Sequence, residues 1–535
     1  MTFTRVAHVL FSIISLLVVP NFSAQTVLSS TWFTPLDKEA LRGREIADSL
    51  EAMMPCLLPL PDWAGDVHGS GKRGVAGQVS EKFGGLNIDG ETRFIQGDDA
   101  GTATIIGLRV YGDFDEIFHY EISRERWKTP VPQHLYDSAI KWGQFDGVGR
   151  VSGGNPGSGS ARALQIDRFV FRTSIKLSES IELSLGNGPH HWGPGIRSLY
   201  FDRSMSPAPY ARLYIDTGPI HYAHILLRTT HPMEVLDSNE IGWVAAHMVD
   251  VSLGAGFSGS LFGAVKWRSN DNGVSNRIEA SYLIPVVAFR PTEYALGSAD
   301  NALIGAQLIW RGSGRRSRNL KTLYGQLMFD ELLTNKLVEG TSWWGNKWGI
   351  LAGASLNSPS GKWGGVLEGS AVRPFTYSHA TEIQAWTHAR KPLGPPLGSN
   401  FVDIVLRLKW VVQEEYIVRF SMERVFRGLD YASGPLSGFS TGSDVFRSYL
   451  DRENDYGSTF LQGVESEFQR LSIDIARPTG GAFGISGIEV FVRGSIRVES
   501  HFSADGGGVA IIDPFNSYRI QGGIRTSRVL EGRDW

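Results

Sequence analysis

The chain is dominated by short runs in which apolar and polar residues alternate. The clearest is 401–425, FVDIVLRLKWVVQEEYIVRFSMERV, where every second side chain is apolar up to Trp410 and again from Tyr416. A period of two places successive side chains on opposite faces of a β-strand. Each half of this stretch has about the 9–11 residues that a tilted strand needs to cross a bilayer. The pattern therefore predicts a β-hairpin, and it fits a soluble sandwich as well as a membrane barrel.

The polar face of this hairpin carries charges of both signs: Asp403, Arg407, Lys409, Arg419 and Glu423. In a soluble sandwich these side chains would face solvent. In a barrel they would face the lumen, where mutual ion pairs explain them without any transport specificity. The same side chains would also line an open pore. The hairpin alone does not decide between these structures.

Residues 1–24 have the pattern of a secretory signal peptide. Arg5 and His8 precede an apolar stretch at 9–19, and we expect cleavage after Ala24. The apolar stretch is too short to span a membrane, and no later segment reaches about 18 continuous apolar residues. An exported chain of this kind can enter a bilayer only as a closed barrel, because lipid offers no partners to backbone polar groups.

Composition excludes several other classes of protein. The formal net charge is −3, so the chain has no strongly basic field that would attract nucleic acid. Cys56 is the only cysteine, which excludes an internal disulfide framework and a cysteine-based metal cluster. The 63 glycines and the aromatic content of 11% favour β-structure with many tight turns. We expect neither a cofactor nor a metal ion.

Residues 25–84 are predicted to form a periplasmic helical or plug segment and a linker. Thr34 can cap a helix that runs to Met54, and Pro35 suits the first helical position. Small residues in its apolar stripe favour close packing on another surface, such as a barrel; a free amphipathic arm is the alternative. Residues 85–535 are then the barrel.

Alternating runs continue from about residue 85 to the end of the chain. Outside the hairpin they include 104–111, 118–122, 181–185, 278–284, 302–310, 323–330, 488–499 and 518–529. With the weaker runs, the count is about 20 strands. The C-terminal Trp535 also fits a barrel of the outer-membrane type.

The connections between these runs alternate in length. The short ones are 112–113, 176–179, 217–218 and 411–413, and the long polar ones are 126–160, 187–207, 231–243 and 427–460. Short turns at one end and long loops at the other are typical of outer-membrane barrels. Two segments, 287–300 and 332–345, break the alternation because they are long where short turns are expected.

Three stretches resemble the Wzi-type capsule-assembly family of outer-membrane proteins. The first is 183–213, LSLGNGPHHWGPGIRSLYFDRSMSPAPYARL; the second lies within 287–310 and contains FRPTEYALGSADNALIGAQLIW; the third is 323–349, with LYGQLMFDELL followed by WWGNKWG. The resemblance extends over roughly residues 85–535. It implies an all-β membrane protein, a large antiparallel transmembrane β-barrel of about 18 strands with a short N-terminal helical plug segment. It also implies lectin-like binding of capsular or other exported polysaccharide, without turnover.

The first of these stretches carries the candidate polysaccharide-binding residues. They are His190, His191, Trp192, Arg197, Asp202 and Arg203. Flat aromatic rings stack on sugars, and arginine and carboxylate groups bind hydroxyls or uronates in a bidentate manner. On an outer loop these groups would form a sugar site. The alternative is a loop folded inward, with Trp192 packed and the glycines permitting tight turns.

A metal site at His190 and His191 is disfavoured, because neighbouring side chains rarely reach one ion and the spacing places no third ligand. An acid/base pair at Asp330 and Glu331 is also disfavoured. Adjacent residues at the end of a strand point to opposite faces, so these two carboxylates are expected to be rim charges.

Three tryptophans, Trp343, Trp344 and Trp348, lie in the third motif. Aromatic side chains gather at both interfaces of a transmembrane barrel, which favours an interfacial girdle. A stacking platform for sugars is the alternative.

Enzymatic activity is not expected. The chain has no G-x-S-x-G elbow, no P-loop and no H-E-x-x-H motif, and nothing pairs His119 or His224 with a serine. We therefore expect a non-enzymatic barrel in the outer membrane of a Gram-negative-type envelope that assists polysaccharide assembly or attachment. A general diffusion or oligosaccharide-specific porin is the alternative, favoured by the same lumen charges. Expected partners are capsular or exopolysaccharide, outer-membrane lipid and polysaccharide export components; the chain is expected to be a monomer that does not bind nucleic acid.

Overall fold

The computed structural model describes residues 85–526, except for 98–99, 115–116, 132, 146, 156–162, 234–237, 271–277, 285–299, 313–319, 359–361, 414, 479–487, 503–513 and 515. The predicted signal peptide 1–24, the predicted helix 34–54 and its plug segment, Cys56 and Trp535 lie outside the described residues.

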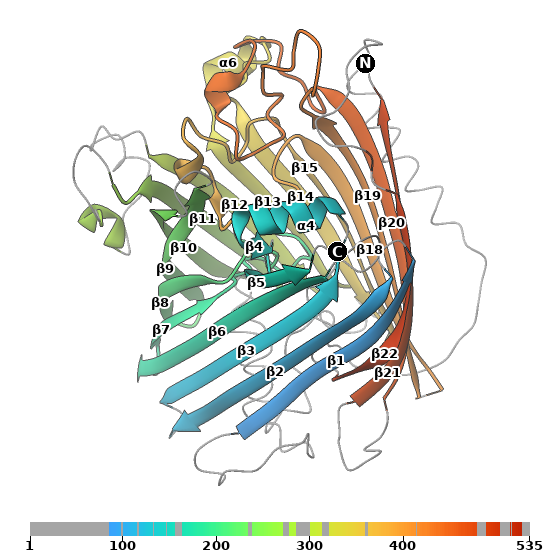
Figure 1. The fold of residues 1–535 in the computed structure, drawn as a ribbon. Helices are drawn as coiled ribbons and strands as arrows, with labels where there is room; N and C mark the ends of the chain where they lie inside the picture. Colours follow the sequence, from blue (N-terminus) through green and yellow to red (C-terminus); the bar gives the residue numbers. More distant parts are fainter. Residues whose placement is uncertain are drawn as a thin grey trace.

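A single large sheet closes on itself to form a barrel (Figure 1). In the described residues, eighteen antiparallel strands make up the wall. In chain order they are β1 (Gly85–Gly97), β2 (Gly101–Phe114), β3 (Phe118–Pro130), β6 (Ala163–Ser178), β7 (Ile181–Gly188), β8 (Ala208–Asp216), β9 (Ile220–Met233), β10 (Ser238–Gly254), β11 (Phe257–Arg268), β12 (Asn301–Arg311), β13 (Leu320–Glu331), β14 (Lys347–Asn357), β15 (Trp363–Val372), β18 (Phe401–Val412), β19 (Tyr416–Leu429), β20 (Val464–Pro478), β21 (Ile488–Phe502) and β22 (Ser517–Thr526).

Pairing of β22 with β1, from Glu91↔Arg525 to Gly97↔Arg519, closes the barrel. Closure leaves no free sheet edge, which a bilayer requires. The prediction of a large antiparallel barrel is confirmed, and its wall has the eighteen strands that the family resemblance implies.

Alternation along the strands directs polar side chains into the lumen and apolar ones outward. On β18, Asp403 and Lys409 are only 2% and 1% exposed, whereas Ile304 and Leu308 on the outer face of β12 are 50% and 52% exposed. Other exposed outward side chains are Ile106, Leu108, Leu261, Ile350, Ile473, Val492, Ile496, Val498, Ile520 and Ile524. A continuous belt of this kind is favourable only against lipid. The chain is a transmembrane β-barrel. None of the described helices has the length and apolar character needed to cross a bilayer.

The wall has a long-loop end and a short-turn end, as the sequence predicts. The connections at the short-turn end include 115–117, 179–180, 217–219, 255–256, 358–362 and 413–415. Those at the long-loop end include 131–162, 189–207, 269–300, 332–346, 373–400 and 430–463. The predicted long connection at 231–243 is wrong, because β9 ends at Met233 and β10 begins at Ser238.

The two apparent exceptions to the alternation of connections arise from one mistaken strand. Residues 278–284 are not a strand; they contain the 3-10 helix η2 (Ala280–Leu283), and the next described wall strand after β11 is β12. Tyr282 is fully buried because its ring packs on Trp267, 5.1 Å between centroids. The buried Tyr282 therefore gives this segment the alternating sequence pattern of a strand although it is not in the sheet. Without the extra strand, 287–300 and 332–345 both belong to the long-loop end.

Several short elements lie in the long loops. They are α4 (Gln133–Trp142), β4 (Gln144–Phe145), β5 (Gly149–Asn155), α6 (Thr334–Val338), η4 (Glu382–Gln384), β16 (Thr387–His388), β17 (Lys391–Pro392) and η5 (Tyr449–Asp451). Helix α4 packs on the inner face of β3 and β6, where Tyr136 joins Trp127 and Leu164 in a buried cluster. Strand β5 pairs with the part of β6 that the short β7 leaves uncovered.

Candidate functional site

Two long loops fold into the barrel, and we name them by their flanking strands: the β7–β8 loop (189–207) and the β15–β18 loop (373–400). The β7–β8 loop crosses the lumen, because Arg197 reaches Glu423 of β19 (Nη2 to Oε1, 2.5 Å) and Asp403 of β18 (Nε to Oδ2, 3.5 Å). Strand β18 is nine strands away from β7 around the eighteen-stranded wall. The candidate residues therefore lie on a segment that spans the lumen.

A buried carboxylate on the far wall holds the tip of the β7–β8 loop. Glu368 of β15 accepts hydrogen bonds from the backbone N–H groups of Ile196 (2.9 Å) and Arg197 (2.7 Å), and from the Tyr324 hydroxyl (2.7 Å). The same contact explains why the second glycine of the WGPG motif, Gly195, has no side chain. A Cβ on Gly195 would lie 2.1 Å from Glu368 Oε2, so no larger residue fits without displacing the tip.

Asp202 organises the loop from within and does not face solvent. It is fully buried, and its carboxylate accepts hydrogen bonds from the backbone N–H groups of Ser198 and Ser204, both at 2.9 Å. Arg203 is partly buried; its guanidinium donates to Gly195 O (3.4 Å). Exposure on an outer loop, the first interpretation of the candidate residues, is wrong for Asp202; the inward fold, the alternative, is the one observed.

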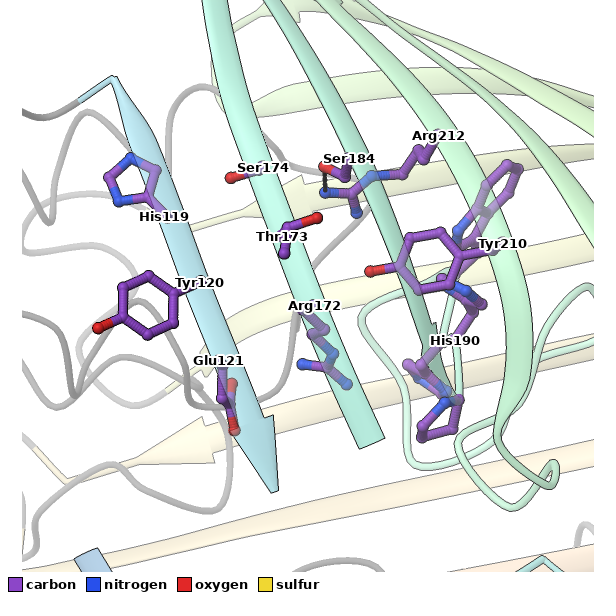
Figure 2. Close-up of a pocket in the computed structure, with 13 residues that line it drawn as sticks. His119, Tyr120, Glu121, Arg172, Thr173, Ser174, Ser184, His190, Tyr210 and Arg212 are labelled. Atoms are coloured by element: carbon purple, nitrogen blue, oxygen red, sulfur yellow. Dashed lines mark hydrogen bonds between the residues drawn. The ribbon is translucent and has the colours of Figure 1, made fainter. Parts of the chain in front are cut away.

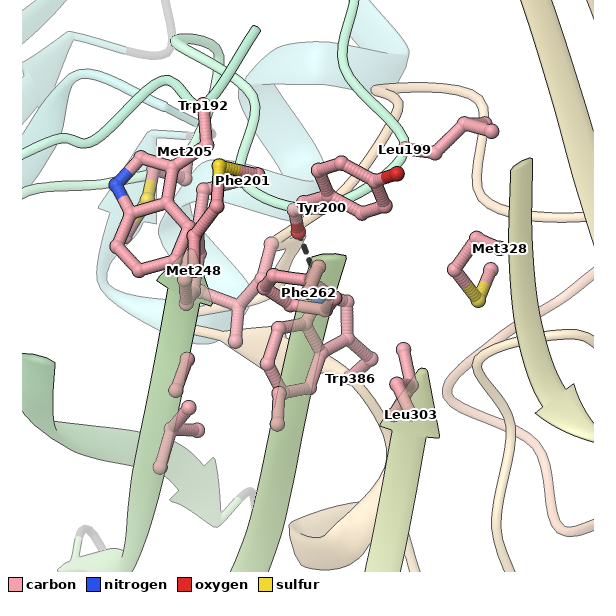
Figure 3. Close-up of a cluster of buried hydrophobic side chains, with 14 of the residues drawn as sticks. Trp192, Leu199, Tyr200, Phe201, Met205, Met248, Phe262, Leu303, Met328 and Trp386 are labelled. Atoms are coloured by element: carbon pink, nitrogen blue, oxygen red, sulfur yellow. Dashed lines mark hydrogen bonds between the residues drawn. The ribbon is translucent and has the colours of Figure 1, made fainter. Parts of the chain in front are cut away.

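Trp192 also packs inward and is 2% exposed. Its ring meets Phe201 and Phe262 edge to face, with centroid distances of 5.1 and 5.8 Å. Figure 3 shows these rings beside Tyr200 and Trp386 in one cluster. Because the cluster joins the loop to side chains of the wall strands β11, β12 and β13, it forms a packed core inside the lumen. We call it the lumen core.

The two histidines are neutral and have separate partners. His191 Nδ1 accepts a hydrogen bond from Arg203 N (3.2 Å), so its Nε2–H donates to Gly195 O (3.0 Å). Burial, reinforced by the nearby Arg203, lowers the pKa of His191 to about 3. His190 packs edge to face on Tyr210 at 4.4 Å, and burial lowers its pKa well below the ordinary value. The described residues contain no group of three or more side chains arranged to hold a metal ion.

The β15–β18 loop packs against the β7–β8 loop inside the barrel. The Tyr377 hydroxyl donates to Leu199 O (2.7 Å), and Trp386 Nε1 donates to Tyr200 O (2.9 Å). On the wall between the two loops, the fully buried Lys266 of β11 donates hydrogen bonds from its side-chain nitrogen to two carbonyl groups of the β15–β18 loop, Ala385 O and Thr387 O. Each loop is thus bound both to the wall and to the other loop.

His388 joins these elements. Its Nδ1 accepts from the backbone N–H of Thr230 on β9, and its Nε2–H donates to Pro207 O of the β7–β8 loop, both at 3.0 Å. Burial lowers the pKa of His388 to about 4. The neutral ring therefore connects both inward loops to the wall.

Two predicted groups near the long-loop end have structural partners. Asp330 is buried rather than a rim charge, because it accepts from Lys347 Nζ (3.0 Å) and from Tyr377 N (2.7 Å). Trp344 packs among loop side chains, with its ring 4.1 Å from the Arg452 guanidinium and 4.9 Å from the Tyr449 ring. The prediction of an interfacial girdle is therefore wrong for Trp344.

Two cavities border the β7–β8 loop. The first, about 520 Å³, lies between the loop and strands β3, β6, β7 and β8. Figure 2 shows Arg172 and Arg212 in its wall, with Ser184 accepting a hydrogen bond from Arg212 Nη2 (3.2 Å). His190 and Trp192 also line this cavity, together with His191.

The second cavity, about 570 Å³, lies against strands β18 to β22 and β1 and includes Arg197 in its lining. The loop therefore presents four of the six candidate residues, His190, His191, Trp192 and Arg197, to internal cavities. The sequence analysis gave the inward direction of this loop only as the alternative to an exposed outer loop. The uncharged runs HHWGPG and SLYF, unusually apolar for an exposed outer loop, are the signal that could have indicated it.

Comparison with known proteins finds similarity only in structure. No protein-family model matches the chain, and no curated protein matches it. Among solved structures, it is similar to Wzi, an outer membrane protein involved in group 1 capsule assembly in Escherichia coli and described as a carbohydrate-binding β-barrel: 11% identity, 82% of this chain and 83% of that chain, TM-score 0.46. It is also similar to Pseudomonas aeruginosa OpdK with vanillate (7% identity, 82% and 97%, TM-score 0.43) and to Acinetobacter baumannii OccAB2 (8% identity, 82% and 97%, TM-score 0.43). Wzi carries the name of the family that the three sequence motifs resemble.

Proposed function

We propose that this protein is an outer-membrane barrel that binds an exported polysaccharide and helps to assemble or attach it at the cell surface, without turning it over. The observation that carries the proposal is the β7–β8 loop, which places His190, Trp192 and Arg197 on the walls of two cavities rich in arginine and hydroxyl groups. Guanidinium and hydroxyl groups bind the oxygens of sugars.

The two loops that pack inside the barrel favour binding over transport. The lumen core joins the β7–β8 loop to the wall, and Glu368 and Lys266 fix the two inward loops from different strands. A packed core of this kind resists displacement, because opening it would expose apolar surface and leave buried polar groups without partners. We infer that a polysaccharide chain is held at the barrel rather than passed through it.

Retention of polysaccharide by the purified protein tests this proposal. Folded full-length protein is incubated with surface polysaccharide from the same cells, immobilised on beads, and the bound fraction is measured. We expect the wild type to be retained and Arg197→Gln to be retained less. Arg126→Gln is the matched control, because this arginine lies on the outer face of β3 and is 67% exposed. Lack of retention of the folded wild type would refute the proposal, and shortening of the polysaccharide during incubation would refute the absence of turnover.

A general diffusion or oligosaccharide-specific porin is the second candidate function. The arginine-lined cavity against β18 to β22 favours it, because a charged wall would also suit the passage of anions. The two functions differ in ion conductance. A binding barrel with a filled lumen conducts poorly, whereas a porin gives steady, large currents.

A further inference from the structure

A row of short side chains crosses the inner face of the wall between two arginines. Cross-strand pairing places Ser421 of β19 opposite Ser472 of β20, and Ser472 opposite Ser495 of β21. Arg407 of β18 pairs with Ser421 at one end, and Arg519 of β22 pairs with Ser495 at the other. Because paired residues share a face, all five point into the lumen in one row across the strands. We call these five residues the serine row.

The serine row leaves room for a ligand. Three adjacent serines fill little of the space that the flanking arginines span, and all five residues line the second cavity, whose space of about 570 Å³ includes a part that is open to solvent. The cavity lining contains six arginines and a single carboxylate, that of Glu423. The arginines are Arg93, Arg197, Arg407, Arg470, Arg493 and Arg519.

The carboxylates around the cavity are already shared among several arginines. Glu423 is bound by Arg197 (2.5 Å) and by Arg470 Nε (3.1 Å). One step toward the short-turn end, Asp474 accepts from Arg493 (3.2 Å) and from two further arginines, Arg419 and Arg525. Arg93 pairs with Glu91 outside the lining (2.9 Å). Within the lining itself, guanidinium groups outnumber carboxylates six to one. An excess of guanidinium groups in a cleft with protein walls attracts an added anion more strongly than the same groups would in open water.

We propose that this cavity binds the acidic groups of the exported polysaccharide, either a carboxylate of a uronic acid or a phosphate ester on the sugar. Guanidinium groups match the paired oxygens of both anions, and the serine hydroxyls lie where the sugar's own hydroxyls need partners. Arg197 connects this cavity to the loop that crosses the lumen. The inference rests on the proposed function and narrows it to acidic polysaccharides.

Calorimetric titration of the folded full-length protein compares two probes of similar length, oligogalacturonate and the neutral maltohexaose. We expect oligogalacturonate to bind at least about tenfold more tightly, and its affinity to fall at least about tenfold between about 50 mM and about 500 mM salt. Equal affinity for the two probes, or an affinity that is independent of salt, would overturn the inference. Inorganic phosphate is the third probe. Weak competition by phosphate supports a sugar-borne group, whereas displacement at the concentration of the oligosaccharide would assign the cavity to a free anion instead.

Substitution of the two ends of the serine row locates the site. Arg407→Gln combined with Arg519→Gln is expected to weaken oligogalacturonate binding about tenfold or more, through loss of charge-assisted hydrogen bonds. Arg424→Gln is the matched control, since Arg424 on β19 pairs with Glu467 on the outer face (2.8 Å) and should leave binding unchanged. Unchanged binding of oligogalacturonate by a folded double variant would refute the assignment of the binding site to this cavity. If the double variant does not fold, the salt dependence of the wild type decides.

Failure of this inference is distinguishable from failure of the proposed function. If the wild-type protein retains the cells' own polysaccharide but binds both oligosaccharide probes equally, the proposed function stands and the acidic site is refuted. If the wild-type protein retains no polysaccharide, both the proposed function and the acidic site are refuted.

Discussion

Glu368 offers the sharpest test of how the β7–β8 loop is held. Its carboxylate accepts three hydrogen bonds: Oε1 takes Arg197 N, and Oε2 takes Ile196 N and the Tyr324 hydroxyl. In Glu368→Gln one of these oxygens becomes an N–H donor, so at least one backbone N–H at the loop tip loses its acceptor. A charge-assisted hydrogen bond contributes about 1.5–3 kcal/mol, so the substitution should favour release of the tip by about 2 kcal/mol.

Hydrogen exchange of the loop-tip amides measures this release directly, because exchange requires local opening. A change of about 2 kcal/mol corresponds to about 30-fold faster exchange of the Ile196 and Arg197 amides. Glu368→Ala, which removes all three acceptor contacts, should accelerate exchange further, while amides in the paired wall strands keep their protection. Glu467→Gln, on the outer face of β20, is the control. Unchanged exchange at the loop tip in Glu368→Ala would refute the claim that this carboxylate anchors the loop.

Three further predictions follow from the inward loops. Lys266→Met removes the donor to two loop carbonyls and should make the β15–β18 loop susceptible to protease in the folded barrel, which gel analysis of the fragments detects; a resistant loop would contradict this. Acidification should release the loops, because His191 and His388 are neutral when packed, with pKa values of about 3 and about 4, and take up protons near pH 6.5 when released. The stabilisation of the packed loops is complete above pH 6.5 and is lost as the pH falls toward the pKa values of the packed histidines; the loss at pH 5 is about 2 kcal/mol per histidine. Hydrogen exchange of the loop amides, corrected for intrinsic rates, should therefore rise from pH 7 to pH 5. Gly195→Ala should speed loop-tip exchange as the Glu368 variants do, because its Cβ would lie 2.1 Å from Glu368 Oε2. In the Glu368→Ala background it should add less, since only the 2.9 Å contacts with Arg197 O and the Tyr324 ring remain.

Local patterns predict the wall of this protein well, because each strand's alternation reflects one constant contrast between lipid outside and a polar lumen inside. Asp403 and Lys409 are buried in the lumen as predicted, and the loop-length pattern identifies the long-loop end correctly. The strand predicted at 278–284 is wrong because its pattern does not arise from this contrast. Tyr282 is buried by a tertiary contact with Trp267 rather than by membership of a sheet, and spacing in sequence does not distinguish the two.

The interior of the barrel could not be predicted in the same way. Whether Trp192 faces a sugar or a core depends on partners such as Phe262, which lies on a strand well separated from it in sequence. The anchor of the loop tip is more remote still, because Glu368 lies 171 positions from Arg197. The serine row was also missed, since it is visible only when the register of five strands is known.

The central claim is that the inward loops fill the lumen, so that the barrel holds polysaccharide rather than conducting solutes. The ion conductance of the purified wild-type protein in a planar bilayer at neutral pH tests it most directly. The packed loops predict little or no steady current. Steady, large open-channel currents from the folded wild type would contradict the claim and favour a porin.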